Sequence, residues 1–364
     1  MKGFVILLVM IAASAAAQDS TKLAEEATLL SVSKLAAPLP QFARIIPEEK
    51  HLRHVRQITF GGQNAEAYLS ADGTELIFQS QRDGHDCDAI YRMNIDGSNV
   101  RMVSNGRGNT TCSFIAPDGK SIIYASTHLV DSACPPKPDM SRGYVWALYK
   151  AYDIFKADPD GSNPVRLTNT DGYDAECVFS PDGSKILFTS VRSGDLEIWM
   201  MNADGSNPEQ LTHEPGYDGG SFFSADGNSI VWRASRPTGE ELTDYQQLLS
   251  EGLIRPRKLE IYTMSLADRK PIKLTDNGAA NFAPYFHPDG KRIIFCSNVN
   301  DPKGRNFDLY LVDVATKQLE QVTFNDSFDG FPMFTRDGKT LVFASNREGK
   351  VPGETNIFVA DWVD

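Results

Sequence analysis

Six positions of the sequence carry a polar side chain placed eight residues before an Asp-Gly pair. They are Asn64, Thr110, Asp174, Asp218, Asn281 and Asp329. Two residues further along each segment stand Glu66, Cys112, Glu176, Gly220, Ala283 and Phe331, which add two carboxylates on the same strand face. A ring of carboxylates and amides suits a hard cation such as Ca²⁺, or the ammonium and guanidinium groups of a peptide. The same side chains also commonly cap backbone N–H groups of their own turns. The spacing leaves turn capping, ligand contact and a metal site open.

A second polar pattern, aromatic-x-Ser-x-Arg in its fullest copies, follows later in each segment. Its basic members are Arg82, His128, Arg192, Arg236 and Arg347. Each base is expected at the same end of the molecule as the acidic positions. The simpler interpretation is an ion pair with a carboxylate of the first set, and the functional alternative is an anchor for a ligand carboxylate such as a peptide C-terminus.

These residues recur because the chain is a repeat. One motif, an apolar pair followed by x-x-Asp-Gly and an apolar triplet, occurs six times, as in YLSADGTELIF and VFSPDGSKILF. The Asp-Gly pair is typical of a tight hairpin, and each unit contains four short strand-like segments. Six four-stranded units in series predict an all-β fold, a six-bladed β-propeller.

The ends of the repeat array indicate how the ring closes. The sixth unit stops after its third strand, whereas residues 55–59, ahead of the first unit, look like the missing fourth strand. An N-terminal strand that completes the last sheet would lock the ring and cover an open edge. We therefore predict a propeller over residues 54–364, preceded by an extension over residues 18–53 with a short helical stretch between residues 22 and 39.

The first seventeen residues have the pattern of a signal peptide. Lys2 precedes a short apolar run, and Ala15, Ala16 and Ala17 supply a cleavage signal. No stretch approaches the 18 apolar residues of a spanning helix. With a net charge of −12 and a pI of about 5.0 the chain lacks a basic footprint, which excludes non-specific binding to nucleic acid or to an anionic membrane. A soluble periplasmic or secreted monomer is expected.

The long segments between repeats all fall between the second and third strands of a unit. They cover residues 128–152, 236–259, 298–307 and 347–356, and residues 240–252 have helical spacing. Because such loops share one face of a propeller, they should surround one mouth of the channel, where we expect the function.

Three of the five cysteines are expected on that same side: Cys87, Cys112 and Cys134. In an oxidising compartment one disulfide among them is expected, tying down the insert that holds Cys134, but spacing does not identify its partner. Cys177 and Cys296 fall in strands and are expected to be buried thiols.

The six Asp-Gly motifs together with the Leu-Thr turns resemble the WD40-like repeat of the TolB-like β-propeller family. The resemblance covers about 310 residues, from His54 to the end. It implies a six-bladed propeller and a role at the bacterial envelope. TolB itself carries an α/β domain ahead of its propeller, and with only about 35 residues available after the leader we expect that domain to be missing here. The catalytic domain that follows similar propellers in prolyl-oligopeptidase-type peptidases is likewise not expected.

Catalytic signatures are scarce. No G-x-S-x-G, H-E-x-x-H, P-loop or C-x-x-C motif occurs. The leading hypothesis is a non-enzymatic module that binds a protein or peptide of the cell envelope through the insert face, with no cofactor other than Ca²⁺ in the channel. One alternative is a metal-dependent small-molecule hydrolase or lyase that uses Asp174, Glu176 and Asp218 with His128 or His213. Another is a structural subunit of a larger envelope complex, the role that the resemblance to the TolB-like family implies.

Overall fold

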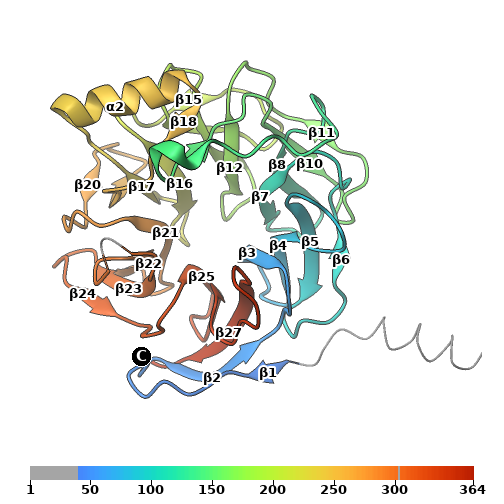
Figure 1. The fold of residues 1–364 in the computed structure, drawn as a ribbon, viewed down its shortest axis with the longest axis vertical. Coiled ribbons are helices and arrows are strands. Elements are labelled where there is room, and N and C mark those ends of the chain that lie inside the picture. The colour runs from blue at the N-terminus through green and yellow to red at the C-terminus, as the bar shows by residue number, and fades with distance from the viewer. Residues whose placement is uncertain (1–39, 302–303) are drawn as a thin grey trace, which may run out of the picture. The chain divides into compact units, whose positions relative to one another are not determined.

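The computed structural model describes residues 40–301 and 304–364. Six large β-sheets stand around one central axis (Figure 1). The innermost strands of successive sheets are neighbours all the way round, and the last sheet contacts the first. The predicted all-β, six-bladed β-propeller is therefore confirmed. The predicted signal peptide and the helical stretch of residues 22–39 lie outside the described residues.

Each blade is an antiparallel sheet whose strands run outward from the channel in chain order. Blade 1 contains β3 (Gln63–Leu69), β4 (Glu75–Gln81), β5 (Ala89–Asn94) and β6 (Arg101–Met102). Blade 2 contains β7 (Thr110–Ile115), β8 (Ile122–Ser126), β10 (Asp153–Ala157) and β11 (Val165–Arg166). Blade 3 contains β12 (Asp174–Phe179), β13 (Lys185–Ser190), β14 (Glu197–Asn202) and β15 (Glu209–Gln210).

The second half of the ring repeats this order. Blade 4 contains β16 (Asp218–Phe223), β17 (Ser229–Ala234), β19 (Glu260–Ser265) and β20 (Ile272–Lys273). Blade 5 contains β21 (Asn281–Phe286), β22 (Arg292–Ser297), β23 (Asp308–Asp313) and β24 (Leu319–Gln321). Blade 6 contains β25 (Asp329–Phe334), β26 (Thr340–Ser345) and β27 (Asn356–Trp362), and two N-terminal strands complete it: β2 (Leu52–Gln57) and β1 (Gln41–Phe42).

The N-terminal strand closes the ring as predicted. Gln57 of β2 lies opposite Phe358 of β27, and the Ile58 N–H donates to the Ile357 carbonyl at 2.9 Å. The strand begins at Leu52, slightly before the predicted boundary, and β1 adds a fifth strand outside it. Strands from both ends of the chain thus share one sheet, which removes the open edge that would otherwise remain.

A hydroxyl side chain next to the outer strand of each blade, Ser104 in blade 1 and a threonine in the other five, accepts a backbone N–H of the third strand. In blade 4 the hydroxyl of Thr275 accepts the N–H of Ile261 at 2.9 Å and donates to the carboxylate of Glu260. Thr59 makes the equivalent contacts in blade 6, accepting the N–H of Ile357 at 2.8 Å and donating to Asn356 at 3.2 Å. The N-terminal strand therefore supplies the sixth copy of this lock.

The apolar triplet of the motif forms the second strand of each blade. In blade 1 its residues Leu76, Ile77 and Phe78 are all fully buried. Successive side chains of a strand point to opposite faces, so this continuous burial means that neighbouring blades cover both faces of the strand. The triplet is apolar throughout because it lies between two packed sheets.

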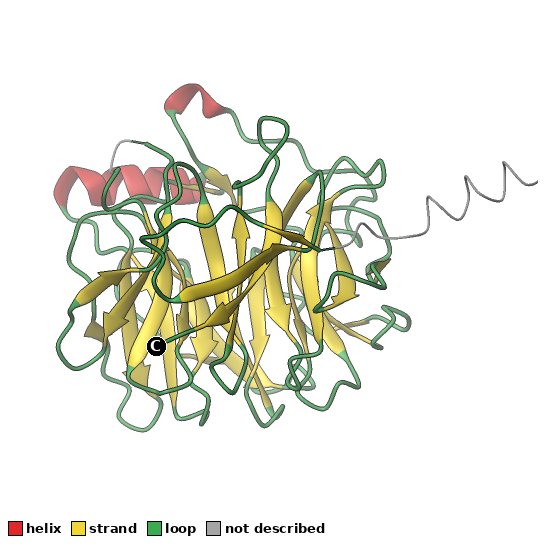
Figure 2. Cartoon of the chain, turned by 90° about the horizontal axis from the view of Figure 1, so that it is seen from below, coloured by secondary structure: helices red, strands yellow, loops and turns green. Residues whose placement is uncertain are grey.

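The inserts carry the elements that do not belong to blades. The blade 2 insert holds a 3₁₀ turn, η1 (Met140–Arg142), and β9 (Trp146–Ala147), and the blade 4 insert holds α2 (Gly239–Ser250) and β18 (Leu253–Ile254). Both helical segments lie on the same side of the propeller (Figure 2). The predicted helix over residues 240–252 matches α2, which buries Tyr245 and Leu248. No helix within the described ranges is both long and apolar enough to cross a membrane.

Candidate functional site

The channel is closed at one end by side chains that meet on its axis. Tyr68 of blade 1 and Phe222 of blade 4, which stand opposite each other in a ring of six, have ring centroids 5.3 Å apart. Phe222 also contacts Tyr285 at 5.4 Å, and Val178 and Met333 from the same motif position belong to the same buried cluster. The first residue of each repeat motif therefore contributes to an apolar floor.

Above this floor lies a cavity of about 980 Å³. Its inner wall is made by the innermost strands, and its outer wall mainly by the two long inserts, with Gly304, Arg305 and Phe307 of the blade 5 insert. Residues of β9 and β18 pair with each other, Leu253 opposite Ala147 and Ile254 opposite Trp146. The inserts of blades 2 and 4 are thus joined into one structure, hereafter the lid, that spans blade 3.

The lid has its own small hydrophobic core. Leu148 from one insert packs with Tyr245 and Ile254 from the other, and with Leu196 from the loop of blade 3 beneath them. The Tyr245 hydroxyl donates to the carboxylate of Asp195 in that loop. The lid is therefore packed on the propeller rather than free above it.

Each innermost strand carries a β-bulge immediately above the floor. The residue at the bulge has a left-handed backbone in every blade: Glu66, Cys112, Glu176, Gly220, Ala283 and Phe331. All six line the cavity. These are the residues predicted two positions beyond the first polar set, and the bulge is what turns them toward the cavity. The result is a polar side formed by blades 1 to 3 and an apolar side formed by blades 5 and 6.

Arg233 on β17 fills the space that glycine leaves in blade 4. A Cβ at Gly220 would lie 1.8 Å from Nη1 of Arg233. The guanidinium forms an ion pair with Glu176 and faces the rings of Trp146, Tyr217 and Phe282 at 5.4 to 5.9 Å. Burial alone would lower the pKa of Arg233, whereas the negative charge of the neighbouring Glu176 carboxylate raises it. The net shift is upward, so the guanidinium stays charged.

Glu176 is fully occupied within the protein. Besides the ion pair with Arg233, it accepts the Thr189 hydroxyl at 2.7 Å and the Gly220 N–H at 2.9 Å. Glu176 therefore adds a polar group to the cavity wall and also holds neighbouring parts of the wall together.

Glu66 and Asp88 are different, because no described residue forms an ion pair with either carboxylate. Burial and the nearby Glu176 raise the pKa of Glu66 to about 7. Burial raises the pKa of Asp88 to about 6, and its Oδ2 accepts a long hydrogen bond of 3.3 Å from Gln79. Both line the cavity. They are the acidic groups that remain available to a ligand.

The first predicted ring lies elsewhere. Its members are 0 to 1% exposed and absent from the cavity lining: Asn64, Thr110, Asp174, Asp218, Asn281 and Asp329. Their side chains hold neighbouring turns, as where the Asn64 amide donates to the Gly61 carbonyl at 2.8 Å and that of Asn281 to the Leu259 carbonyl at 2.7 Å. Of the predicted ligand-binding residues, only Glu66 and Glu176 line the cavity.

The predicted bases pair with this buried ring where the ring residue is acidic. Arg192 contacts Asp174 at 2.9 Å, and Arg236 grips Asp218 with two hydrogen bonds of 2.7 and 2.9 Å. Arg347 joins Asp329 at 2.7 Å and also binds Glu49, with all three groups at most 5% exposed. These contacts match the ion-pair interpretation of the pattern.

Where the ring residue is neutral, the base has another role. Arg82 lies 3.6 Å from the exposed Asp83, and His128 shares a 2.8 Å hydrogen bond with Ser126. Burial, with Arg107 nearby, lowers the pKa of His128. Neither side chain lines the cavity.

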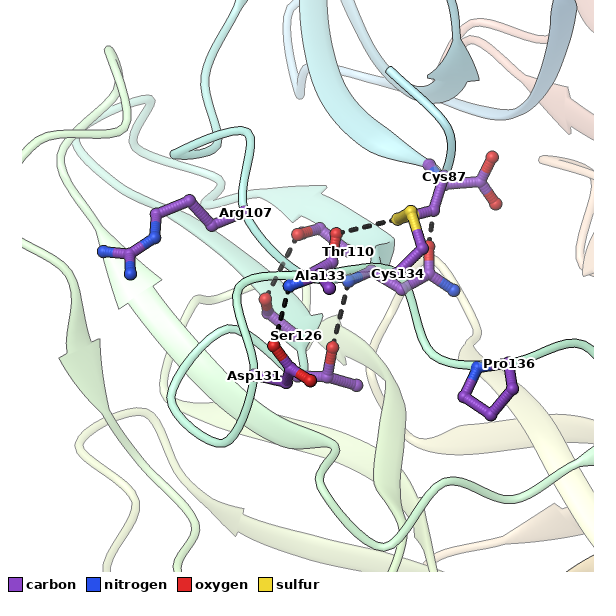
Figure 3. Close-up of a disulfide and its surroundings, with 12 residues drawn as sticks. Cys87, Arg107, Thr110, Ser126, Asp131, Ala133, Cys134 and Pro136 are labelled. Carbon is purple, nitrogen blue, oxygen red and sulfur yellow. Dashed lines mark hydrogen bonds between the residues drawn. A yellow bond between two sulfur atoms is a disulfide. The ribbon is translucent and has the colours of Figure 1, made fainter.

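A disulfide joins Cys87, in the loop between β4 and β5, to Cys134 in the blade 2 insert (Figure 3). The insert is thereby tied to blade 1, and Cys112 is left as a thiol in the cavity wall. Burial, reinforced by Glu66 and Glu176, raises the pKa of Cys112 well above its usual value, so the thiol is neutral. Cys177 and Cys296 are buried thiols, as expected.

Sequence reasoning missed Arg233, Asp88 and the tyrosines of the wall. Arg233 had a detectable signal, because the equivalent positions of other blades hold uncharged residues such as Gln79, Thr189 and Cys296. Tyr173 and Tyr217 each precede an acidic ring residue, a pairing visible in the sequence as Tyr-Asp. Asp88 lies in the loop between β4 and β5, one residue before the third strand of blade 1.

No His, Cys, Asp or Glu cluster among residues 40–301 and 304–364 brings three potential metal ligands together. None of the six histidines lines the cavity.

Comparison with known proteins identifies the repeat. Residues 136–253 match the TolB β-propeller domain family. A TolB homologue from Chlorobium luteolum is 23% identical over 155 residues, which cover 36% of this chain and 35% of the relative. The chain spans about a third of the length of the curated relatives it matches.

Solved structures share the fold at low identity. A putative TolB from Agrobacterium tumefaciens superimposes with a TM-score of 0.54 at 18% identity, covering 83% of this chain and 91% of that one. An oligogalacturonate lyase in complex with manganese gives a TM-score of 0.51 at 17% identity, covering 90% and 97%. The repeated motif and the closed ring of blades show a six-bladed β-propeller, and residues 136–253 of it are similar to the TolB β-propeller domain.

Proposed function

We propose that this protein binds a protein or peptide of the cell envelope through the face that carries the inserts. The observation that carries the proposal is the cavity of about 980 Å³ that is closed at the floor and walled by the lid. Its volume lies at the upper end of the range for ligand sites, which is about 300 to 1,000 Å³.

The composition of this face supports the same function. Tyr144 of the lid is 52% exposed, and Arg305 from the blade 5 insert lies over its ring at 5.3 Å. Tyrosine, tryptophan and arginine are the residues most enriched at binding hot spots. The fold likeness to TolB gives the same direction but is a likeness of fold alone.

A location in the periplasm or outside the cell is part of this proposal. It is supported by the leader-like pattern of residues 1–17 and by the Cys87–Cys134 disulfide, because such bonds persist in oxidising compartments.

The experiment is site-specific photocrosslinking in a bacterial host. A photoreactive amino acid at Tyr144, on the lid, should trap a partner, whereas the same group at Val165 should not. Val165 is 60% exposed and lies on the outer strand β11, away from the cavity. The identified partner should then bind the purified protein, and Tyr144→Ala should weaken that binding while Val165→Ala leaves it unchanged. Equal trapping at both positions, or none at Tyr144, would refute the proposal.

A second candidate is a small-molecule hydrolase or lyase in the same cavity. It is favoured by Glu66, because a carboxylic acid with a pKa of about 7 in a cavity is suited to proton transfer. The described residues do not fit a manganese centre, since none of their carboxylates gather into a cluster of three potential ligands and Glu176 is already paired with Arg233. The metal-dependent form is therefore tested by elemental analysis of the protein purified without chelator, with Glu66→Gln as the activity control.

A further inference from the structure

The cavity contains more negative charge than its own arginine neutralises. Glu66, Asp88 and Glu176 all line it, and Arg233 is engaged by Glu176. The other cationic groups of the lining, Arg257 and Arg305, are exposed side chains of the outer wall. Among the residues that the structure describes, two carboxylates in the inner part of the cavity, Glu66 and Asp88, thus have no ion-pair partner.

Tyrosine side chains that line the cavity lie near these carboxylates, since burial and the nearby charges, Asp88 and Glu66 among them, raise the pKa of Tyr152 well above its usual value. Tyr152 and Tyr173 meet edge to face with centroids 5.7 Å apart, and Tyr149 lies 6.1 Å from Tyr152. Tyr68 of the floor closes the lower side, and burial together with the charge of Glu66 raises the pKa of its hydroxyl. A carboxylate beside several aromatic faces is the arrangement that binds organic cations, which aromatic rings attract through their faces.

An independent observation comes from Ser221. This residue is 1% exposed and lines the cavity, yet its hydroxyl has no hydrogen-bond partner in the protein. A buried hydroxyl left without a partner costs free energy, and a donor from a ligand would remove that cost. Ammonium and guanidinium groups are donors only, which suits a hydroxyl oxygen as acceptor.

We infer that the inner part of the cavity, formed by Glu66, Asp88, Ser221 and the surrounding tyrosines, binds a single ammonium or guanidinium group. The inference rests on the proposed function in one respect: the ammonium or guanidinium group is taken to belong to a basic side chain of the bound protein. A neutral or anionic group of the same size has no comparable partner there, because Arg233 is already neutralised by Glu176.

The charge state of Glu66 sets the pH dependence of binding. The groups that face it are Glu176, Cys112, Arg233 and Asp88, with Tyr68 on its own strand. Lys137 faces Asp88. Since the cation requires the ionised carboxylate, it should bind more tightly as the pH rises from about 5.5 to 8, and it should displace a proton near neutral pH.

The test uses small probes and therefore does not depend on a protein partner. Nα-acetyl-lysine amide and Nα-acetyl-arginine amide represent a protein side chain, cadaverine represents a free amine, and Nα-acetyl-norleucine amide is the uncharged control. Wild-type protein should bind the charged probes in calorimetry or NMR titrations, with proton release at pH 7, and should not bind the norleucine amide. Preference for the two amino-acid amides over cadaverine identifies a side chain as the source.

Two variants make the assignment specific. Glu66→Gln should weaken binding of the lysine amide by about tenfold or more, equivalent to about 1.4 kcal/mol, and should abolish the proton release. Asp88→Asn provides a second, independent loss. Glu214→Gln, which removes an exposed carboxylate that does not line the cavity, should bind as wild type does.

The outcomes separate the two proposals. Equal binding of the norleucine amide, or unchanged affinity in both Glu66→Gln and Asp88→Asn, overturns the cation site. If no partner is crosslinked at Tyr144 while the charged probes bind normally, the proposed function is overturned and the cation site remains.

Discussion

Trp146 and Ile254 are partners in one short antiparallel ladder, although they belong to the inserts of different blades. The ladder converts two separate loops into a wall on one side of the cavity. Trp146 also presents its ring to Arg233 at 5.6 Å, so the lid contacts the charged group in the channel directly. The position of the lid and the electrostatics of the cavity are therefore linked.

The disulfide should matter mainly for the lid. In the double variant Cys87→Ser/Cys134→Ser the blade 2 insert loses its tie to blade 1, so proteolysis within residues 128–152 should accelerate. The free energy of unfolding should fall by about 2 to 4 kcal/mol, the usual effect of losing a bridge. Limited proteolysis with mass spectrometry locates the cuts, and wild type treated with reductant serves as the matched sample. Unchanged cleavage of the insert would contradict the role assigned to the bond.

Gly220→Ala should disturb the Arg233–Glu176 pair. The backbone at this position is left-handed, φ +60°, which alanine adopts only with strain, and the new methyl group would collide with the buried guanidinium. We expect a loss of stability of about 2 kcal/mol or more, measured by urea denaturation. Gly278→Ala is a suitable control, because that glycine also has a positive φ, +66°, but has open space around its Cβ position. Equal losses in the two variants would mean that the contact with Arg233 contributes nothing.

Arg347 and Arg82 occupy the same repeat position but have different partners. Arg347→Leu strands the buried carboxylates of Asp329 and Glu49, so stability should fall by about 3 to 5 kcal/mol. Arg82→Leu breaks a contact with an exposed aspartate and one with the ring of Tyr91 at 5.5 Å, and should cost less than about 1 kcal/mol. Chemical denaturation of both variants provides the comparison. Similar losses would show that the repeat position, rather than the buried pair, determines the cost.

Glu197 should make stability depend on pH. Burial raises its pKa to about 8, so the folded state retains a proton that the unfolded chain releases near pH 4.5. The stability linked to this group is therefore fully present below about pH 4.5 and is lost as the pH rises through about 8. Glu197→Gln stays neutral at every pH, and its thermal midpoint should gain on wild type increasingly between pH 5 and 9.

Scanning calorimetry across that range tests this dependence. Glu214→Gln, at an exposed position, should show a constant difference from wild type. A pH-independent difference for Glu197→Gln would mean that Glu197 is ionised in the folded protein.

The fold could be predicted in detail because it depends on local signals that recur. Asp-Gly turns and buried triplets such as Leu76 to Phe78 specify one blade each, and residues 55–59 specify the closure. The site could be predicted only in part, because a sequence gives the type of a side chain but not its partner. Asp174 and Arg192 each looked available to a ligand, yet each satisfies the other.

The reverse holds for Asp88 and Arg233. Neither was predicted as a site residue, since the importance of Asp88 depends on burial and that of Arg233 on pairing with Glu176 from another blade. Contacts between blades depend on how the blades are arranged in the tertiary structure, and the sequence of a single repeat does not reveal that arrangement. Glu66 was found because it shares its position with five other residues, and the bulge common to all six turns it inward.

The contact of Tyr68 with Phe222 makes the central passage a dead end. A ligand that enters the cavity must leave through the same opening, because the closed floor blocks passage through the channel from one face of the propeller to the other. A ligand then dissociates through a single opening, so changes to the lid should alter the residence time of the ligand more than its affinity for the interior of the cavity.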